Sequence, residues 1–487
     1  MNQFTTNMWS EGYDLPVPFQ VPLEDGQVLI CEEVVRAMPG RRYVCRGTYN
    51  GEAVYAKLFS ISNKATREWK SEQTGIDSLN AAGVLAPNII ESVVLEQVEL
   101  QLIIYTEIAN AENARLKWDV GDESDRKMLI ISLLKVLASH HNANLIQQDL
   151  HLANFMCRGE EVFTLDASDI AKKVISYDIA IESLSGLFAL LNSKYDAWIP
   201  ALSKHYFSLR GMPFSDLDIL ALEKGVLKSR CYKRRKYLKK IFRSCSAFVS
   251  KKSWRRRIVY DRKNESVAFS KFCDNPDNSA DSVSKTVLKD GNTCLVTQLT
   301  FAQQRLVIKR YNIKNFWHGV GRAFRETRAS KSWRNAHRLL HCGILTPKPI
   351  AFVENRFGPI RHNAWFIMEF TDGDSARKYF HDTSITDSQL REIAVQFAQF
   401  FGVMKREGFS HGDMKATNFI IHDEQLYVID LDAMQAHEDK NSHFRALQRD
   451  AARFMKNWES LPAVGSLFCE VFTAEGLSDY LPLEPTS

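Results

Sequence analysis

Two stretches of the chain carry the same three polar residues at the same spacing. In each, an Asp is followed five residues later by an Asn, and twelve residues later a second Asp ends an apolar run. The stretches are QQDLHLANF, leading to LDA, and HGDMKATNF, leading to IDL. The residues are Asp149, Asn154 and Asp166 in the first half, and Asp413, Asn418 and Asp430 in the second.

These residue types suit the transfer of a phosphoryl group. The first Asp of each set can accept a proton from an attacking hydroxyl, or orient that hydroxyl. The Asn and the second Asp offer hard oxygen ligands of the kind that hold Mg²⁺ against nucleotide phosphates. We therefore predict Asp149 and Asp413 as catalytic bases, and Mg²⁺ sites at Asn154 with Asp166 and at Asn418 with Asp430.

The elements that must position the first set lie upstream of it. The stretch EAVYAKLF predicts a strand in which apolar residues surround Lys57, as expected of a lysine that holds nucleotide phosphates. Residues 64–83 predict a helix on which Glu68 and Glu72 share a face. We favour Glu72 as the partner of Lys57. The stretch LQLIIYTEI, from Leu100, predicts a buried strand that leads into a hinge between two lobes.

The second half repeats these elements. QRLVIKRYN supplies Lys309, residues 321–343 predict the helix, and AWFIMEF predicts the hinge strand. AGVLAP in the first half matches CGILTP in the second at an offset of 260 positions, which puts Ser332 where Glu72 stands. Glu326 lies more than a turn earlier and is a weak substitute. The second half is therefore expected to lack the acidic partner of its lysine.

Glycine-containing turns precede both lysine strands, although neither half contains G-x-G-x-x-G. Gly40, in PGRRYVCRG, and Gly291, in LKDGNT, are predicted to let backbone N–H groups approach a phosphate. The glycine expected after the second Asp is missing from both sets, where Ala167–Ser168 and Leu431–Asp432 follow instead. This departs from typical protein kinases and favours an atypical branch.

In these motifs both halves resemble the lipopolysaccharide core kinase family, the Kdo and heptose kinases of Gram-negative bacteria, within the protein-kinase-like superfamily. The residues that carry the resemblance are PGRRYVCRG, VYAKLF and QQDLHLANF, and then LKDGNT, LVIKRYN, SWRNAHRLL, GILTPKPIA and HGDMKATNF. It covers roughly residues 35–245 and 270–460. It implies ATP- and Mg²⁺-dependent phosphorylation of a sugar hydroxyl of the inner core, at the cytoplasmic side of the inner membrane.

The two halves depart from the family pattern in different ways. Gln147 stands where kinases usually have the His of the catalytic loop, and Ser332 replaces the acidic partner in the second half. Because its charged set is complete with Lys57 and Glu72, we expect the first site to be active. The second site is expected to be either active or a nucleotide-binding regulatory lobe.

The predicted fold is α+β, with two tandem kinase-like bilobal domains, each a β-rich N-lobe over a helical C-lobe. We expect the domains at 1–245 and 286–487, joined by a basic and polar linker at 246–285. A chain of 487 residues is long enough for two domains, and 45% hydrophobic residues are enough to fill two cores.

Composition also bears on location. Nine Cys without a C-x-x-C pair or zinc spacing predict free thiols in a reducing compartment. The N-terminus has no basic segment followed by an apolar one, and no apolar run reaches ~18 residues. We therefore expect a cytoplasmic protein whose contact with the inner membrane, if any, is peripheral.

Charge is concentrated in one part of the chain. From Gly225 to Tyr260 there are fourteen Lys or Arg and no Asp or Glu. KSRCYKRRKYLKKIFRSC predicts the final helix of the first domain, and KKSWRRR extends the charge into the linker. We interpret residues 228–257 as a surface for the lipopolysaccharide core, another anionic glycolipid or the anionic inner membrane. A solvated helix face and RNA binding are the alternatives, and no recognised nucleic-acid motif supports the latter.

Three function classes remain open. A sugar kinase of the lipopolysaccharide core is favoured. A protein or small-molecule kinase on the same fold is second, because the fold does not fix the substrate. A pseudokinase scaffold docked on the membrane, with one or both lobes inactive, is third.

Overall fold

A computed structural model of the chain describes residues 2–13, 15–24, 26–277, 282–291, 293–312 and 326–481. The start of the helix expected at 321–343, residues 321–325, lies outside these ranges. The chain divides into two compact units, the first Met1–Leu191 with Tyr195–Arg230 and the second Asn192–Lys194 with Cys231–Ser487. Both units combine β-sheet with helices, so the α+β fold class is confirmed.

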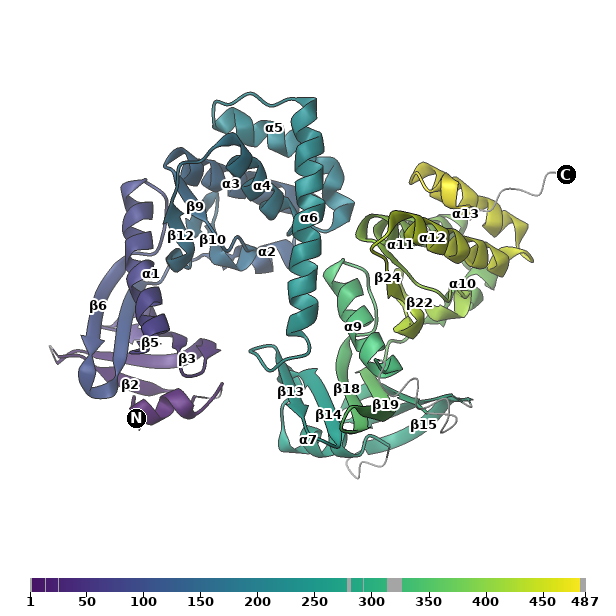
Figure 1. Cartoon of the computed structure of the whole chain (residues 1–487), viewed down its shortest axis with the longest axis horizontal. Helices are drawn as coiled ribbons and strands as arrows, with labels where there is room; N and C mark the ends of the chain where they lie inside the picture. Colours follow the sequence, from purple (N-terminus) through teal and green to yellow (C-terminus); the bar gives the residue numbers. More distant parts are fainter. Residues whose placement is uncertain are drawn as a thin grey trace. The chain divides into compact units, whose positions relative to one another are not determined.

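A seven-stranded sheet carries Lys57 in the first unit (Figure 1). Its order is β1 (Asn2–Gln3), β2 (Phe19–Pro22), β3 (Val28–Met38), β4 (Arg42–Tyr49), β5 (Glu52–Ser60), β7 (Leu100–Thr106) and β6 (Ile89–Leu95). On β5 the side chains of Val54, Ala56 and Leu58 are buried in the sheet's core. Because side chains alternate along a strand, Lys57 points to the opposite face, toward the helical lobe.

Helix α1 (Asn63–Ala81) connects this sheet to the active-site loop. It begins where the Ser62 hydroxyl accepts the N–H of Ala65, and the chain leaves it through Gly83 at φ +66°. A left-handed residue at this position is a common helix C-terminus. The helix packs on β5 and β7 and on the turn Ala167–Asp169, directly after Asp166. It therefore carries Glu72 to both Lys57 and the loop.

A further group of helices forms the second lobe of each unit. In the first unit they are α2 (Ala114–Val120), α3 (Glu123–Asn142), α4 (Tyr177–Phe188) and α5 (Ile199–Leu209). In the second they are α10 (Ala376–His381), α11 (Asp387–Glu407), α12 (Lys440–Met455) and α13 (Pro462–Ala474). The central helices α3 and α11 both begin with a capping box, and each buries residues three and four apart.

The second unit also contains a seven-stranded sheet. Its order is β13 (Phe248–Lys252), β14 (Arg256–Asp261), β18 (Pro349–Phe357), β19 (Ile360–Glu369), β17 (Gln304–Tyr311), β16 (Cys294–Phe301) and β15 (Ser282–Gly291). Lys309 lies on β17, and α9 (Arg328–His341) packs on β18 and β19. The order β15-β16-β17-β19-β18 repeats the order β3-β4-β5-β7-β6 of the first sheet.

The small sheets around the catalytic loops repeat as well. The three-stranded sheets are β11 (Glu161–Thr164), β10 (Phe155–Arg158) and β8 (Glu112–Asn113), and β23 (Gln425–Val428), β22 (Phe419–His422) and β20 (Asp374–Ser375). The two-stranded pairs are β12 (Ile170–Lys172) with β9 (Leu145–Gln147), and β24 (Gln435–Ala436) with β21 (Phe409–Ser410). The sequence duplication therefore has a matching duplication of strand order.

The segment expected to be a linker, 246–285, is largely folded. Strands β13 and β14 form a hairpin, and β14 pairs with β18 from Arg256 to Tyr260. Helix α7 (Val267–Asp274) buries Phe269 and Phe272 against the same sheet. Val249, Ile258 and Tyr260 of this segment are thus buried in the second core, whereas Trp254 is exposed. Residues 278–281 lie outside the described ranges.

The basic helix expected at the end of the first domain is α6 (Asp216–Lys240). Its residues up to Arg230 belong to the first unit and those from Cys231 to the second, which differs from the boundary expected at 245. All nine Cys are free thiols. No helix in the described ranges combines the length and apolar character that crossing a membrane requires.

Candidate active site

Lys57 and Glu72 form the predicted pair in the first unit. Lys57 Nζ lies 2.6 Å from Glu72 Oε1, and the Glu72 side chain is 1% exposed. Glu72 also accepts the backbone N–H groups of Ala167, at 3.3 Å, and Ser168, at 3.0 Å. Glu68, the other candidate one turn earlier, instead pairs with Arg41. The packing of α1 on the sheet therefore selects Glu72.

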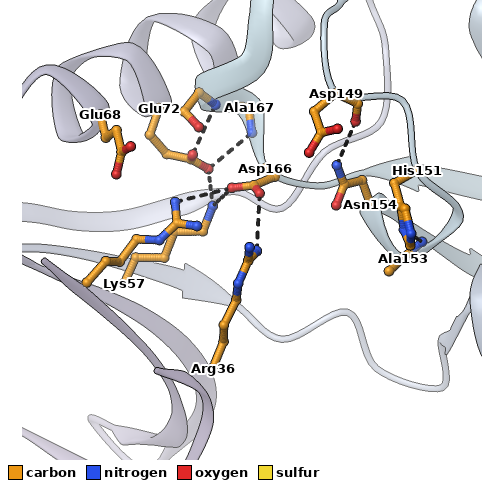
Figure 2. Close-up of polar contacts among 12 residues, drawn as sticks. Arg36, Lys57, Glu68, Glu72, Asp149, His151, Ala153, Asn154, Asp166 and Ala167 are labelled. Carbon is orange, nitrogen blue, oxygen red and sulfur yellow. Dashed lines mark hydrogen bonds and ion pairs between the residues drawn. The ribbon is translucent and has the colours of Figure 1, made fainter. Parts of the chain in front are cut away.

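Asp166 lies among three cations (Figure 2). Its Oδ1 is 3.1 Å from Lys57 Nζ and 3.4 Å from an Nη of Arg42, and its Oδ2 is 3.6 Å from an Nη of Arg36. Burial would raise the pKa of this carboxyl, but Lys57, Arg42 and Arg36 outweigh burial and lower its pKa to about 2. The backbone of Asp166 is left-handed, at φ 55°. Such backbone at a non-glycine residue is a feature of functional sites.

The catalytic loop of the first unit is hydrogen-bonded through its backbone and Asn154, but not through the Asp149 carboxylate. Asn154 Nδ2 donates to the backbone carbonyl of Asp149 at 2.9 Å, and the Asn154 carbonyl accepts the N–H of Leu165. Asp149 itself is exposed, and within the described ranges its carboxylate has no hydrogen bond or ion pair. The Gln147 side chain, 4% exposed, has neither amide atom hydrogen-bonded to a described residue. The departure at Gln147 therefore removes an anchor from the loop.

Lys309 in the second unit contacts a different set of residues. Its Nζ lies 2.5 Å from Asp430 Oδ1. At the position of Glu72, the hydroxyl of Ser332 hydrogen-bonds Tyr311. Glu326, the proposed substitute, binds Ser330 and Arg334. As predicted, the described residues offer Lys309 no glutamate.

An ion pair that the sequence analysis missed occupies the corresponding place. Arg328 of α9 donates to Asp432 Oδ2 at 2.6 Å, and the Asp432 side chain is 8% exposed. Burial raises the pKa of Asp432, assisted by the charge of Asp430 and opposed by Lys309 and Arg328. The alignment of the two halves contained a signal for this ion pair. Arg328 aligns with Glu68 and Asp432 aligns with Ser168, so the second half has two charged residues of opposite sign at these positions.

Asp413 is held by several partners in the second unit. Arg453 Nη2 lies 2.8 Å from one of its carboxylate oxygens. Asn418 Nδ2 donates to the other oxygen at 3.1 Å and to the Asp413 carbonyl at 2.9 Å. Lys415 Nζ is 3.8 Å from the carboxylate. The pattern D-x-K in HGDMK already places Lys415 two residues after Asp413 in the sequence, and Lys415 was not among the predicted site residues.

Asp450 of α12 holds the loop around Asp413 through hydrogen bonds to its backbone. Its carboxylate oxygens accept the backbone N–H groups of His411, at 2.7 Å, and Gly412, at 2.9 Å. The His411 ring is hydrogen-bonded to the carbonyl of Ile429, and burial lowers its pKa. The first unit has Gly186 where the alignment of the loops puts Asp450. The second loop is therefore fixed next to Asp413 by His411 and Asp450. The first loop has neither residue at the aligned positions.

A cleft of about 410 Å³ in the second unit is bordered by Lys309, Asn418 and Asp430. The residues that line it are Lys289, Gly291, Thr293, Cys294, Val296, Lys309, Tyr311, Arg328, Ser332, Thr346, Phe366, Met368, Thr417, Asn418, Ile429, Asp430 and Leu431. Gly291 lines this cleft, and its contact with a phosphate stays a prediction. The N–H of Gly40 donates to the carbonyl of Trp9, so it is not free to bind a phosphate. The predicted phosphate contact of Gly40 is not supported by this geometry.

The two units differ in how well they fit Mg²⁺. Protein Mg²⁺ sites commonly use one or two carboxylates together with substrate phosphates. Asp430 Oδ2 has no hydrogen bond or ion pair to the described residues, and Asn418 borders the same cleft, so this pair fits. Both oxygens of Asp166 already face cations. In the described ranges, no group of three or more His, Cys, Asp and Glu side chains is placed to hold a metal ion by itself.

Comparison with known proteins identifies kinases. Residues 282–464 match the model of the lipopolysaccharide kinase (Kdo/WaaP) family. The chain is 28% identical over 166 residues to the RIO-type serine/threonine-protein kinase Rio1 of Haloferax volcanii, covering 33% of this chain and 52% of that protein. It is 30% identical over 122 residues to the serine/threonine-protein kinase RIO1 of Chaetomium thermophilum, covering 23% and 22%.

Among solved structures, vaccinia related kinase 3 aligns with a TM-score of 0.27 and 13% identity, over 35% of this chain and 59% of that one. The chain thus spans about half the length of the first of its curated relatives, and about a fifth of the second. These matches support a phosphotransferase enzyme, and the part of the chain that matches the lipopolysaccharide kinase (Kdo/WaaP) model is less than half of it.

Proposed function

We propose that the chain is an ATP-dependent phosphotransferase whose second unit transfers the γ-phosphoryl group to an acceptor hydroxyl. The observation that carries this proposal is the placement of Asp413. Arg453 and Asn418 fix its carboxylate, and Asp450 fixes the loop that bears it. Catalysis of phosphoryl transfer depends mostly on positioning and electrostatic stabilisation, so a fixed base is what the reaction needs.

The charged groups that line the second cleft, and those of the adjoining catalytic loop, each have a task in this reaction. Asp413 orients the acceptor hydroxyl and accepts its proton. Lys309 and Lys415 offset negative charge on the phosphates, one from the sheet and one from the loop. Asn418 and Asp430 present oxygens to Mg²⁺, which when bound neutralises charge on the transferring group. The first unit, which we had expected to be active, places no comparable partner on Asp149.

For the acceptor we propose a sugar hydroxyl of the lipopolysaccharide inner core. The match of residues 282–464 to the lipopolysaccharide kinase (Kdo/WaaP) family supports this choice. The basic residues that are exposed in the second unit also support it, because the inner core is rich in anionic groups. We place the reaction on the cytoplasmic side of the inner membrane, with ATP and Mg²⁺ as cofactors.

The test is transfer of labelled phosphate from ATP to purified core glycolipid with Mg²⁺. We expect Asp413→Asn to abolish transfer, and Asp149→Asn to retain at least about half of it, because Asp149 is exposed and unanchored. Loss of transfer in Asp149→Asn with retention in Asp413→Asn would reverse the assignment of the two units. No transfer to glycolipid by the wild type would reject the sugar acceptor.

A protein acceptor is the second candidate. The observation that favours it is the similarity to two Rio1 serine/threonine-protein kinases. The same assay separates the two, since label then appears on polypeptide and not on glycolipid, still dependent on Asp413. Retention of nucleotide binding with no transfer to either acceptor would favour the scaffold alternative.

We further propose that residues 228–257 dock on an anionic membrane surface or glycolipid. Arg234 of α6 turns inward to Glu407, whereas many of the basic side chains around it are exposed. The exposed ones in the second unit are Arg235, Lys236, Lys239, Arg243, Lys251, Lys252 and Arg255. Trp254, 64% exposed, stacks edge-on against exposed Phe357 beside them. Amphipathic aromatics next to basic residues are typical of membrane interfaces.

Sedimentation with vesicles measures this docking. We expect binding to vesicles containing anionic lipid, little binding to neutral vesicles, and weaker binding after Lys251→Glu with Lys252→Glu. Arg391→Glu with Lys405→Glu, on α11, provides a control with the same change of charge. Equal binding of both double variants would reject the surface.

A further inference from the structure

The hairpin of β3 and β4 in the first unit delivers two arginines to the active-site Asp. Arg36 lies near the end of β3 and Arg42 begins β4, and both extend to Asp166. The turn between them keeps its own backbone occupied, since the N–H of Gly40 donates to Trp9. In this hairpin, cationic side chains therefore take the place that backbone N–H groups have in a glycine-rich loop.

Arg42 has hydrogen-bonding capacity that the protein does not use. Its side chain is 6% exposed, and its guanidinium lies over the ring of Phe59 at 5.8 Å. One Nη contacts Asp166, while the buried Nε has no hydrogen bond to any described residue. A guanidinium offers five N–H donors, and buried donors are almost always satisfied in folded proteins. An anion at this place would satisfy them.

The arrangement also explains why a divalent cation fits poorly here. Lys57, Arg42 and Arg36 approach both oxygens of Asp166, so Mg²⁺ would have to enter among three positive charges. In the second unit Lys309 approaches only one oxygen of Asp430. Figure 2 shows Asp149 and Asn154 to one side of Asp166, away from Arg36 and Lys57. The cations thus form a group of their own.

We propose that Arg36, Arg42 and Lys57 form a polyphosphate-binding site in the first unit that works without a divalent metal. The ligand class is a chain of phosphates, as in a nucleoside triphosphate or inorganic tripolyphosphate. Arginine binds phosphate in a bidentate manner, and a charge-assisted pair of this kind is stronger than a neutral hydrogen bond. On binding, the two guanidinium groups exchange Asp166 for phosphate oxygens.

Equilibrium binding of ATP in EDTA tests the site, with the full chain carrying Lys309→Met. This background removes the phosphate-binding lysine of the second unit, so binding reports the first unit. We expect one ATP per chain in EDTA, and about tenfold weaker binding in Arg36→Gln. Arg36 is the residue to change first because its side chain is 55% exposed, which leaves the fold intact. Arg42→Lys provides a second variant that keeps the buried charge.

Arg158→Gln provides the matched control. Arg158 lies in the same unit, is 45% exposed and pairs with one carboxylate, that of Glu161. We expect it to bind ATP as the background protein does. Competition between inorganic tripolyphosphate and ATP would show that the phosphates alone are recognised. Failure to compete would show that the nucleoside is required as well. In both cases we expect ATP binding to depend on Arg36.

Two results would overturn the proposal: no ATP bound in EDTA but binding on addition of Mg²⁺, or equal affinity of Arg36→Gln and Arg158→Gln. Because the assay measures binding in a chain whose second cleft is disabled, its outcome is independent of whether Asp413 transfers phosphate.

Discussion

Arg328, whose side chain is 43% exposed, forms an ion pair at 2.6 Å with the buried Asp432, and this pair joins α9 to the turn following Asp430. In the first unit the corresponding helix and turn are also joined, but there the helix supplies the acceptor: Glu72 of α1 accepts the N–H groups of Ala167 and Ser168. Both links fix the helix against the loop that bears the second Asp. The second unit thus keeps the connection while losing the lysine–glutamate pair.

Arg328→Gln should therefore impair phosphotransfer in the second unit. Without Arg328, the buried Asp432 loses its ion-pair partner, so we expect kcat to fall about tenfold or more, with partial recovery in Arg328→Lys. Initial rates with saturating ATP measure this. Arg391→Gln, which breaks the exposed pair with Glu470, is the control and should retain normal rates. Wild-type kcat in Arg328→Gln would contradict a positioning role.

Glu72→Gln should loosen the loop after Asp166 in the first unit. The change removes a buried charge that binds Lys57 and two backbone N–H groups, which we expect to lower the local free energy of opening by about 3 kcal/mol. Amide hydrogen exchange at Ala167 and Ser168 reports this directly. Glu68→Gln, one turn earlier on α1, should cost less than about 1 kcal/mol because its pair with Arg41 is partly exposed. Equal protection in the two variants would contradict the assignment.

Asp450→Asn should disable the second catalytic loop. An amide has one acceptor oxygen, so it cannot accept both the His411 and Gly412 N–H groups without leaving its own NH₂ buried. We expect kcat to fall by about tenfold to a hundredfold with a smaller change in KM, because the base is misplaced while the cleft persists. Asp423→Asn, at a carboxylate that is 87% exposed, is the control. An unchanged kcat would show that the loop is held by other contacts.

His337 should make stability dependent on pH. Burial lowers its pKa to about 3, whereas an unfolded His titrates near 6.5. Below about pH 6.5 the unfolded state therefore binds the extra proton, so the free energy of unfolding falls as pH drops toward 3. His337→Asn should reduce this dependence between pH 6 and 4 by up to about 1.4 kcal/mol per pH unit. Urea unfolding at a series of pH values, with exposed His381→Asn as control, measures it; identical slopes would contradict the assignment.

The two units depart from a complete kinase site in complementary ways. The first has Lys57 with Glu72 but no counterpart of Asp450, and the second has the loop anchored by Asp450 but lacks the glutamate. The sequence revealed both substitutions, at Gln147 and Ser332. The sequence did not reveal the consequences of these substitutions, because those depend on which side chains pack around Gln147 and Ser332.

What the sequence determined by itself was the local pattern and its repetition. Strand alternation placed Lys57 and Lys309, helical spacing put Glu68 and Glu72 on one face of a helix, and the D-x4-N spacing marked each catalytic loop. These features depend on neighbours a few residues away, so they can be read along the chain.

Only the tertiary structure decided which charges meet. Arg42 and Asp166 are 124 positions apart, and Arg328 and Asp432 are 104 apart, so their pairing depends on how sheet, helix and loop pack. The same holds for the folded segment expected to be a linker, whose strand β14 finds its partner in β18 nearly a hundred residues later. Long-range pairings of this kind are set by the shape of the whole core, and no short window of sequence contains them.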